Sequence, residues 1–488
     1  MPADIILVID AGTSAMRAVR VALPDGRADV VAAEAWPMFE PEDAAPGGRE
    51  YDGALVSTAL ARVVDRASAD GDFAAVAVAG QREGVVYLDG DGSPLLVSPN
   101  IDARAVAEGM AIDAAHAGAV YAETGRLPSL MFAPAKLRWL AAWRPRDAER
   151  VRTVLPLADW LAMLATGSPF RTRGLAVEIG VARVGDGDAS PLLRELGFDT
   201  ALLPPAIDDG SVGGTVAFGP LAGVPVVHAG GDTQCALAAL GCRPGEAGVV
   251  AGWSAPVQVV TDAPVFDGEQ RTWTGRHVAP GEFVLESNAL ETGRAWRWLL
   301  EMMGIDEREG DALAATSPPG ARDALAVLGP RVMRAHRLSA GFGALTMPLP
   351  IVMTAPARAD ILRSATEAVA CSIRANLEQA EEISGRPADG AIGLGGGMSR
   401  SALFARVLAD VLGRPVRVAR SPETTALGAA CLTAAALGWH ASAEEAARAL
   451  SERGCVVEPD AATAATYEDV YARWCATADA FERLAVEV

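Results

Sequence analysis

An acidic residue followed by glycine and two hydroxyls stands near the start of the chain. Asp10 ends an apolar run, Gly12 follows, Thr13 and Ser14 come next, and Arg17 lies just beyond. Glycine lets the backbone approach phosphate oxygens, amides and hydroxyls donate hydrogen bonds to them, and a carboxylate holds hydrated Mg²⁺. The segment therefore indicates a triphosphate–metal site, although an ordinary Asp-Gly hairpin turn would use the same residues.

A second carboxylate follows another buried strand. Asp232 comes after Gly230 and Gly231, behind the apolar run 224–227, and helical spacing follows it. A carboxylate at the mouth of an α/β domain can take the proton of a substrate hydroxyl while that hydroxyl attacks a γ-phosphate. The alternative is that Asp232 caps the helix while the glycines supply the turn.

Further candidate segments lie at bends of the chain. The glycine run 395–397 stands between a strand and a helix, where it could pass a nucleotide or simply make a tight connection. It does not match the G-x-x-x-x-G-K-[ST] pattern of a P-loop. Gln81, Arg82 and Glu83 place an amide, a cation and a carboxylate on one turn, which could hydrogen-bond a polyol. They and the similar segment around Asp102 would also be ordinary as surface turns.

These residues depend on strands that end near one another. Strands alternate with helical stretches throughout, so the sequence predicts an α/β fold. The first half opens with a hairpin of residues 5–9 and 16–21, and the second with a hairpin of 248–251 and 257–260. Two such hairpins indicate a duplicated core with a cleft between the copies, and we divide the chain into residues 1–244 and 245–488.

Other elements are expected around the two hairpins. In the first half they are a strand at 30–35, a helix at 53–69, a strand–turn–strand unit of 74–79 and 85–88, and mostly helix from 101 to 167. In the last third, apolar residues recur every three or four positions from Leu362 to Ala380 and predict a helix that Gly385 and Pro387 end. A strand at 391–394, a helix capped by Ser399 or Ser401, and a strand at 416–418 follow.

The amino-acid composition limits which classes of molecule the protein is expected to bind. The chain has 488 residues, half of them apolar, and a formal net charge of −20. Nucleic acid needs clustered Lys and Arg, so we expect no nucleic acid partner. We expect no signal peptide, a buried helix rather than a membrane span at 424–439, and six cysteines that are buried and reduced. None of the five histidines has a ligand spacing, so we assign them no metal. A cytoplasmic protein without membrane contact is the expectation.

The order of the segments resembles the FGGY family of carbohydrate kinases over nearly the full chain. Asp10 to Arg17 match its first phosphate motif, and Gly231-Asp232 match the segment with its catalytic aspartate. In the second half, Glu291 to Trp296 resemble its nucleotide segment. Its adenosine-site region is resembled by Gly395 to Ser399, Leu408 to Val416, and Glu423 to Ala430.

The resemblance implies two actin-like (ribonuclease H-like) α/β domains around a cleft, with the sugar mainly on the first and ATP mainly on the second. It implies an enzyme that uses ATP and Mg²⁺ to phosphorylate a hydroxyl of a small sugar or polyol. Asp232 would be the general base, and Asp10 and Asp232 would hold Mg²⁺ through water. The residues assigned to the nucleotide are Asp10, Gly12, Thr13, Ser14, Arg17, Gly252, Ser254, Gly293, Gly396, Gly397 and Ser399. Those assigned to the acceptor are Gln81, Arg82, Glu83, Asp102 and Asp232.

Three branches of the family share features with the chain. Gln81 to Glu83 match the polyol-binding turn of glycerol kinases, whereas segments 82–86, 100–105 and 158–162 look closer to autoinducer-2 kinases, and xylulokinases are a third relative. We therefore expect a four- to five-carbon ketose, a polyol or an autoinducer-2-like acceptor.

One departure from the family leaves alternatives open. The second phosphate motif usually reads Gly-Thr, but this chain has Gly252-Trp253-Ser254. Either Ser254 supplies the hydroxyl after a shift of one residue, or Trp253 crowds the γ-phosphate position. A non-catalytic sugar or nucleotide sensor and an actin-like ATPase are the rival functions, and the intact Asp10 and Asp232 speak against the sensor. A homodimer stays an open option for the assembly.

Overall fold

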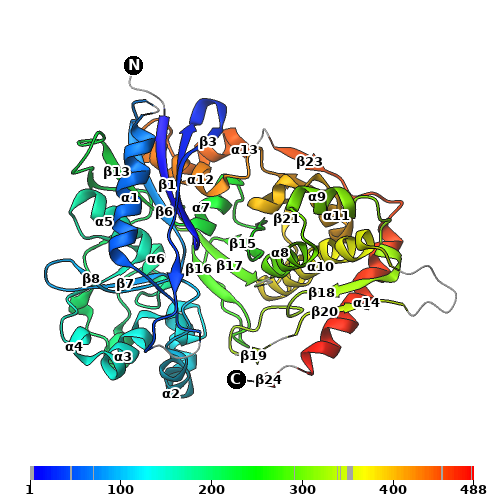
Figure 1. Cartoon of the computed structure of the whole chain (residues 1–488), viewed down its shortest axis with the longest axis horizontal. Helices are drawn as coiled ribbons and strands as arrows, with labels where there is room; N and C mark the ends of the chain where they lie inside the picture. The colour runs from blue at the N-terminus through cyan, green and yellow to red at the C-terminus, as the bar shows by residue number, and fades with distance from the viewer. Residues whose placement is uncertain are drawn as a thin grey trace.

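The chain forms two large mixed sheets with helices on both sides (Figure 1). The computed structural model describes residues 5–43, 47–69, 71–288, 290, 292–337, 339–340, 342–348, 356–451, 454–484 and 486–487. Strands alternate with helices along these residues, so the predicted α/β class is confirmed.

The first sheet has the strand order β12-β13-β6-β1-β2-β3. β1, β6 and β13 run parallel, whereas β2, β3 and β12 are antiparallel to their neighbours. The predicted opening hairpin and the strand that follows it are confirmed. The strands are β1 (Ile5–Ala11), β2 (Ala15–Ala22), β3 (Arg27–Ala35), β6 (Ala75–Gly80), β12 (Ser211–Thr215) and β13 (Pro225–Gly231).

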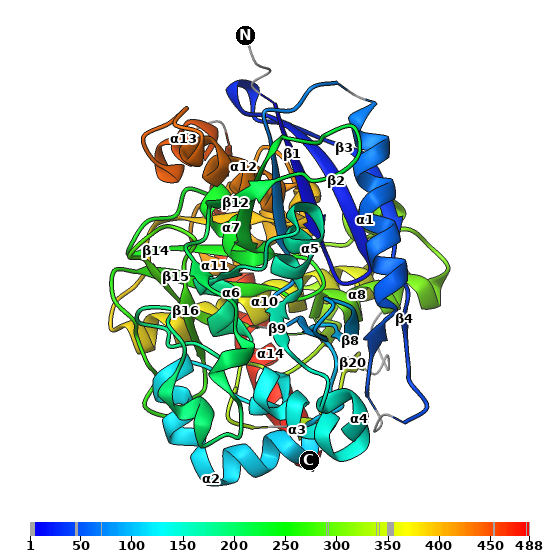
Figure 2. The same cartoon turned by 90° about the vertical axis from the view of Figure 1, so that its left-hand side faces the viewer.

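Helices cover both faces of this sheet (Figure 2). Leu7 and Ile9 of β1 pack in one apolar cluster with α1 and α5, whereas Ile6 and Val8 pack in another with α7 and α12. Successive side chains of a strand point to opposite faces, and a strand buried on both faces is apolar throughout. The helices are α1 (Gly53–Ser68), α5 (Leu157–Thr166), α7 (Asp232–Ala239) and α12 (Thr424–Ala436).

The predicted strand–turn–strand unit at 74–88 is wrong in its pairing. β6 belongs to the first sheet, whereas β7 (Val85–Leu88) lies between β8 (Pro94–Ser98) and β9 (Thr153–Pro156) in a separate three-stranded sheet. Between the two strands, Glu83 adopts a φ of 50°, and the chain leaves the first sheet. Such backbone costs of order 1–3 kcal/mol in a residue other than glycine and often marks a functional turn.

The second sheet has the order β16-β17-β15-β14-β21-β22-β23. The β14–β15 hairpin is antiparallel, as predicted, and β21 lies parallel to β14 on its other side. The strands are β14 (Glu246–Val250), β15 (Pro256–Thr261), β16 (Trp273–Arg276), β17 (Phe283–Asn288), β21 (Asp389–Gly395), β22 (Val416–Val418) and β23 (Cys455–Val457).

Local signals in the last third predicted the helices there well. α10 (Arg358–Ser384) ends at Gly385, whose φ of 77° places it in the left-handed region that glycine favours at helix ends. Ser401 caps α11 (Ala402–Leu412) by accepting a 2.9 Å hydrogen bond from the amide of Phe404. Ser399 is not the cap, because its hydroxyl donates to the carbonyl of Gly396.

The remaining elements surround these two cores. The helices are α2 (Val106–Thr124), α3 (Ala133–Trp143), α4 (Pro145–Ala148), α6 (Arg173–Glu178), α8 (Thr292–Met303), α9 (Glu307–Ala314), α13 (Ala443–Ser451) and α14 (Ala464–Glu482). The 3₁₀ helices are Leu23–Asp25, Ser129–Met131, Pro191–Arg194, Thr200–Leu202, Ala321–Asp323 and Gly397–Arg400. The short strands are β4 (Met38–Phe39), β5 (Glu50–Tyr51), β10 (Arg171–Thr172), β11 (Ala206–Ile207), β18 (Leu325–Val327), β19 (Ser339–Ala340), β20 (Ala344–Thr346) and β24 (Val486–Glu487).

The structure bears on two expectations from the sequence, the lack of a membrane span and the burial of the cysteines. The search for membrane spans, made over the described residues, finds none with the length and hydropathy needed, and α12 is the buried helix that was expected. Four cysteines are free and buried, as predicted, but Cys455 is exposed on β23 and Cys475 is half-buried, so the expectation of burial is wrong for these two.

α12 ties the end of the chain back to the first sheet. Figure 1 shows this helix, in orange, beside β1 and α7 rather than with the yellow helices of the second half. Gly428 lies against the backbone of Cys235 in α7, and a Cβ on Gly428 would overlap the carbonyl oxygen of Cys235. The division proposed at residue 244 separates the two sheets, but α12 joins them.

We predict that Gly428→Ala lowers the stability of the protein. Alanine normally favours a helix over glycine by about 0.5–1 kcal/mol, but here the methyl group has no room, and overpacking costs about 1–3 kcal/mol or more. Urea-induced unfolding measures the change. The matched control is Gly118→Ala on exposed α2, where no atom lies within 4 Å of the added Cβ, and equal effects of the two substitutions would contradict the packing argument.

Candidate functional site

Three candidate residues follow the ends of neighbouring parallel strands. Asp10 lies at the end of β1, Gln81 follows β6, and Asp232 follows β13. The register pairs Ala11 with Gly80 and Gly80 with Gly231, so the three strands end side by side. Ligands of open α/β sheets bind at this edge, and the fold therefore brings these three residues together.

The turn after β1 is held by side chains from other segments. The carbonyl of Gly12 accepts hydrogen bonds from Trp36 Nε1, at 3.1 Å, and from Gln81 Nε2, at 3.4 Å. The hydroxyl of Tyr51 donates to the carbonyl of Thr13. These bonds fix the turn through its carbonyl oxygens, and the amide of Gly12 donates within the turn to the carbonyl of Ala15 at 3.1 Å. Ser14 is exposed.

Asn100 connects this turn to the Gln81 segment. Its amide donates a 2.7 Å hydrogen bond to Gln81 Oε1, and its side-chain oxygen accepts from the Thr13 hydroxyl at 3.2 Å. Gln81 thus has protein partners on both ends of its side chain, and the structure gives it a part in holding the turn. Whether Gln81 also contacts an acceptor stays a prediction.

Asp232 is the first residue of α7. Its Oδ1 accepts hydrogen bonds from the amide and the hydroxyl of Thr233, at 2.6 and 3.1 Å. Oδ2 has no hydrogen-bond partner within the described residues, although the side chain is only partly exposed. Burial raises the pKa of Asp232 to about 6, with Asp10 adding to the increase and Arg82 opposing it. A carboxyl with this pKa is suited to accepting a proton near neutral pH.

Arg17 joins the first phosphate motif to the second half of the chain. Its guanidinium donates to Asp10 and, at 2.7 Å, to Glu423, which immediately precedes α12. Glu423 also accepts a 2.8 Å bond from Arg400. Burial raises the pKa of Asp10 against the opposing charge of Arg17. The Arg17–Glu423 pair therefore closes one end of the site between the two halves.

Arg82 and Glu83 are not surface turn residues. Arg82 is 7% exposed and makes a two-pronged ion pair with Glu286 of β17, at 2.6 and 3.0 Å. Glu83 accepts a 2.7 Å bond from Arg126, which also pairs with Glu178 at 2.7 Å. We call these five residues the buried charge cluster. It joins the turn after β6 to the second sheet.

Within the buried charge cluster, Glu178 is a carboxyl whose pKa is raised. Burial raises its pKa to about 7, although Arg126 and Arg82 oppose the increase. Gln234 of α7, two residues beyond Asp232, donates a 2.8 Å hydrogen bond to it. The cluster therefore lies directly beside the helix that carries Asp232.

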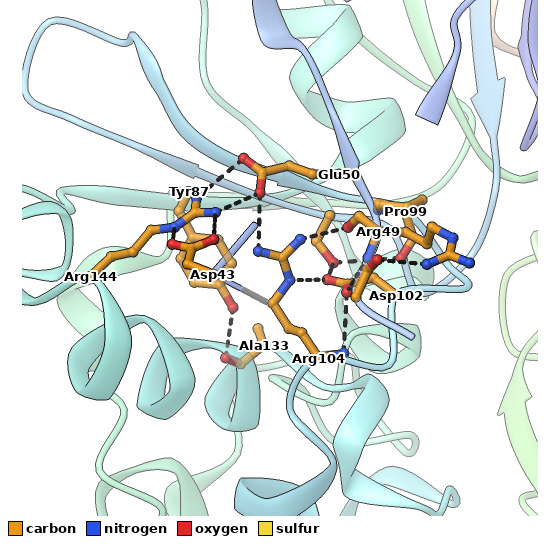
Figure 3. A network of polar contacts seen from close by, with 11 residues as sticks. Asp43, Arg49, Glu50, Tyr87, Pro99, Asp102, Arg104, Ala133 and Arg144 are labelled. Carbon is orange, nitrogen blue, oxygen red and sulfur yellow. Dashed lines mark hydrogen bonds and ion pairs between the residues drawn. The ribbon is translucent and has the colours of Figure 1, made fainter. Parts of the chain in front are cut away.

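Asp102 lies in a different network, shown in Figure 3. It is fully buried, and its carboxylate accepts from Ser98, from the amide of Arg49, and from the amide and Nε of Arg104. Arg104 continues the network to Glu50 at 3.1 Å. Both Asp102 oxygens are thus occupied by protein donors. This geometry favours a role in holding the loop of Asn100, and acceptor contact by Asp102 stays a prediction.

The glycines of the second half line two adjoining loops. β14 and β21 end in register at Val250 and Gly395, so the loops that follow lie together. Gly396 has a φ of 82°, and a Cβ on it would lie 2.5 Å from the carbonyl of Ala251. A Cβ on Gly293 of α8 would lie even closer, 1.9 Å from the carbonyl of Gly252. By contrast, a Cβ on Gly252 or Gly397 would have no atom within 4 Å. Glu291 lies outside the described residues.

Trp253 is 37% exposed. Its ring stacks on the guanidinium of Arg294 at 5.0 Å, and Trp298 packs against the same guanidinium at 4.7 Å. The amide of Arg294 donates to the carbonyl of Trp253. The tryptophan is therefore held at the start of α8. The neighbouring Ser254 is partly exposed, and contact of its hydroxyl with a phosphate stays a prediction.

The metal expected from the sequence needs oxygen ligands. Among the described residues, no group of three or more His, Cys, Asp or Glu is arranged to hold a metal ion. Asp10 is bonded through Oδ2 and Asp232 through Oδ1, so each has a second oxygen without a partner in the described part of the chain. Mg²⁺ usually takes one or two carboxylates together with water and phosphates, so this pair fits it.

Sequence reasoning missed the partners of the predicted residues. Arg126, Glu178 and Glu286 were not singled out, and Glu423 was recognised only as part of a motif. A signal existed for Glu286, which is the one charged residue in the strand FVLESN, all of whose positions are buried. A charge in a buried strand is rarely present without a partner.

Comparisons with known proteins agree with this geometry. The model of the N-terminal domain of the FGGY family of carbohydrate kinases matches residues 5–241, and that of the C-terminal domain matches 247–437. The autoinducer-2 kinase of Escherichia coli (strain K12) is 29% identical over 502 residues, which cover 96% of this chain and 93% of that protein.

Solved structures share the whole fold. The xylulose kinase from Rhodospirillum rubrum is 26% identical, with a TM-score of 0.81 over 98% of this chain and 99% of that one. A gluconate kinase from Lactobacillus acidophilus, 17% identical, has a TM-score of 0.83 over 98% and 100% of the two chains. The predicted pair of actin-like α/β domains around a central cleft is confirmed by the likeness to these kinases.

We predict that Asp102→Asn destabilises the protein. Loss of the carboxylate leaves the buried guanidinium of Arg104 without a full counter-charge, and breaking a buried ion pair from one side costs about 3–5 kcal/mol. Unfolding in urea, followed by tryptophan fluorescence, measures the loss. The control is Asp52→Asn at the exposed start of α1, where asparagine caps as well as aspartate. Unchanged stability with weakened acceptor binding would instead make Asp102 an acceptor residue.

Proposed function

The chain belongs to the FGGY family of carbohydrate kinases, and on that premise we propose that it transfers the γ-phosphoryl group of Mg-ATP to a hydroxyl of a small sugar or polyol, with Asp232 as the general base. The observation that carries the proposal is the placement of Asp232. β13, which Asp232 follows, ends in register with β6 and β1. The charges of Asp10 and Arg82 act on the Asp232 carboxyl, and Gln234 of the same helix contacts the buried charge cluster.

The nucleotide is held mainly by the second half in this proposal. Gly252 and Gly397 leave open space on the adjoining loops. Ser254 and Ser399 follow them closely in the sequence, and Gly293 packs on the carbonyl of Gly252. Backbone amides without side chains beside them can approach phosphate oxygens. From the first half, the proposal assigns to the phosphates Thr13 and Ser14 in the turn after β1 and Arg17 on β2.

The chemical step needs one proton acceptor. Oδ2 of Asp232 takes the proton of the acceptor hydroxyl while the hydroxyl oxygen forms a bond to the γ-phosphorus. The bond from that phosphorus to the oxygen bridging the β- and γ-phosphates breaks, and ADP leaves with the electron pair. The hydrogen bonds of Thr233 to Oδ1 fix the carboxylate so that Oδ2 faces the acceptor.

Asp10 and Asp232 are the residues that would hold Mg²⁺. When bound, the ion would neutralise charge on the β- and γ-phosphates. Arg17, which pairs with Asp10, orients that carboxylate and opposes the rise in its pKa that burial causes.

For the acceptor we propose a four- to five-carbon ketose, polyol or autoinducer-2-like compound. The support is the similarity to an autoinducer-2 kinase and a xylulose kinase over nearly the whole chain. Arg82 and Glu83 remain the proposed acceptor contacts, because Arg82 lies against Gly231, which precedes Asp232, and its charge acts on the Asp232 carboxyl. Gln81 and Asp102 act in this proposal chiefly by holding the turns that carry the contacts.

We predict that Asp232→Asn lowers kcat by about 10²–10⁴-fold, because the amide cannot take the proton. ADP release in the presence of xylulose, ribulose, erythritol, glycerol or the autoinducer-2 precursor measures the rate. Asp29→Asn, which changes an exposed carboxylate on β3, is the control. ADP release that is equally fast without any acceptor would indicate an actin-like ATPase instead.

The raised pKa of Asp232 predicts a pH dependence. The base must be ionised, so kcat/KM should rise with pH through about 6 and level off above 7. An aspartate with the ordinary value of 3.8 would give a flat profile above pH 5. Rates measured with both substrates far below their KM report the free protein. Because Arg82 lowers the pKa of Asp232, Arg82→Gln should move the rise to higher pH, and a shift to lower pH would contradict the assignment.

A further inference from the structure

Arg82 is the only positive charge among the three residues of the acceptor turn, Gln81 to Glu83. Its two terminal nitrogens bind the two carboxylate oxygens of Glu286, at 2.6 and 3.0 Å. Paired nitrogen–oxygen bonds of this kind are the geometry in which arginine also binds a carboxylate or phosphate of a ligand. In this protein, the fork of Arg82 is therefore already filled by the protein's own carboxylate.

Glu286 is built to stay ionised in this position. It is 1% exposed, and each oxygen has a second donor, Gln258 Nε2 at 2.8 Å and Asn288 Nδ2 at 3.1 Å. Burial works against its charge, but the charge of Arg82 and these hydrogen bonds outweigh burial and lower the pKa of Glu286. Both oxygens of the carboxylate are consequently paired, each with Arg82 and with one amide donor.

The residues paired around Arg82 provide no net positive charge that could attract an anionic group of an acceptor. The buried charge cluster contains the guanidiniums of Arg82 and Arg126 and the carboxyls of Glu83, Glu178 and Glu286. Glu178 lies 3.7 Å from Arg82, in addition to its bond with Arg126. Two cations therefore face three carboxyls, and the cluster carries no excess positive charge.

This neutralised arginine lies beside the catalytic carboxylate of the proposed function. A Cβ on Gly231 would be 3.2 Å from Cγ of Arg82, and the charge of Arg82 lowers the pKa of Asp232. An acceptor placed against Asp232 would thus meet the buried charge cluster. A carboxylate on that acceptor would face Asp232, Asp10 and the glutamates, and the guanidiniums of Arg82 and Arg126 are already paired.

We propose that Glu286 is a specificity-determining residue that restricts the acceptor to uncharged polyhydroxy compounds by occupying the guanidinium fork of Arg82. The inference rests on the proposed function and adds the charge class of the acceptor to it. The fold itself does not impose this restriction, since a gluconate kinase shares it at a TM-score of 0.83. The restriction comes from a single carboxylate on β17 of the second sheet, which reaches the acceptor turn of the first half.

The test is Glu286→Gln, assayed with the matched acceptors xylitol and D-xylonate, which differ by a hydroxymethyl group and a carboxylate. Glutamine keeps the shape and one oxygen acceptor for Arg82 but removes the charge. We expect the ratio of kcat/KM for xylonate to kcat/KM for xylitol to rise about 10- to 100-fold. Glu286→Asp keeps the charge in a shorter side chain and should leave xylonate excluded.

Glu178→Gln makes the same chemical substitution within the cluster, but the main partner of Glu178 is Arg126, and the pKa of Glu178 is about 7. We expect a smaller gain for xylonate than with Glu286→Gln, and an equal gain would assign the effect to the overall field rather than to the fork of Arg82. If Glu286→Gln does not fold, Glu178→Gln still measures how the loss of a carboxyl in the cluster changes the kcat/KM for xylonate relative to xylitol.

Binding of D-xylonate without ATP, measured by calorimetry, separates this inference from the proposed function. If the unmodified protein releases no ADP with any neutral acceptor, the proposed function fails, while the binding comparison still decides the inference. Folded Glu286→Gln protein that binds xylonate no better than the unmodified protein overturns the role given to Glu286. Tighter binding by Glu286→Gln alone supports it.

Discussion

Three parallel strands that end in register are the constraint on which the rest of this protein depends. β1, β6 and β13 carry Asp10, Gln81 and Asp232 at their carboxyl ends. The strands are buried on both faces, so a shift in register would expose apolar side chains or bury polar ones. The packing of helices on both faces therefore fixes where the two carboxylates stand, with a precision that loops alone would not give.

Ion pairs between the halves complete the site. Arg17 reaches Glu423 at one end, and Arg82 reaches Glu286 at the other. Buried ion pairs add little to stability, because desolvation of the charges offsets their attraction. Their value here is geometric, since Arg82 of the first half reaches Glu286 of β17 only when the two sheets are in one relative position. α12, which belongs to the second half by sequence, reinforces that position by packing on the first sheet.

A set of polar residues holds the phosphate turn in place without being assigned a contact with the phosphates. Asp102 and Arg104 fix the loop of Asn100, and Asn100 binds both Gln81 and Thr13. Loss of the bond between Asp102 and Arg104 would loosen the loop of Asn100 and, through it, the phosphate turn. Such support explains how a turn of small and polar residues can present its amides and hydroxyls to a ligand in a fixed direction.

The sequence by itself determined the local elements and the order of the motifs. Strand runs, the Gly385 helix end and the two hairpins follow from side-chain periodicity and turn chemistry, which act between residues close together in the chain. Only the tertiary structure decided the separation of β6 from β7, the occupied carboxylate of Asp102, and the partners of Arg82 and Arg17. Those partners lie 204 and 406 residues away, and the packing of the two sheets, which no local pattern encodes, brings them into contact.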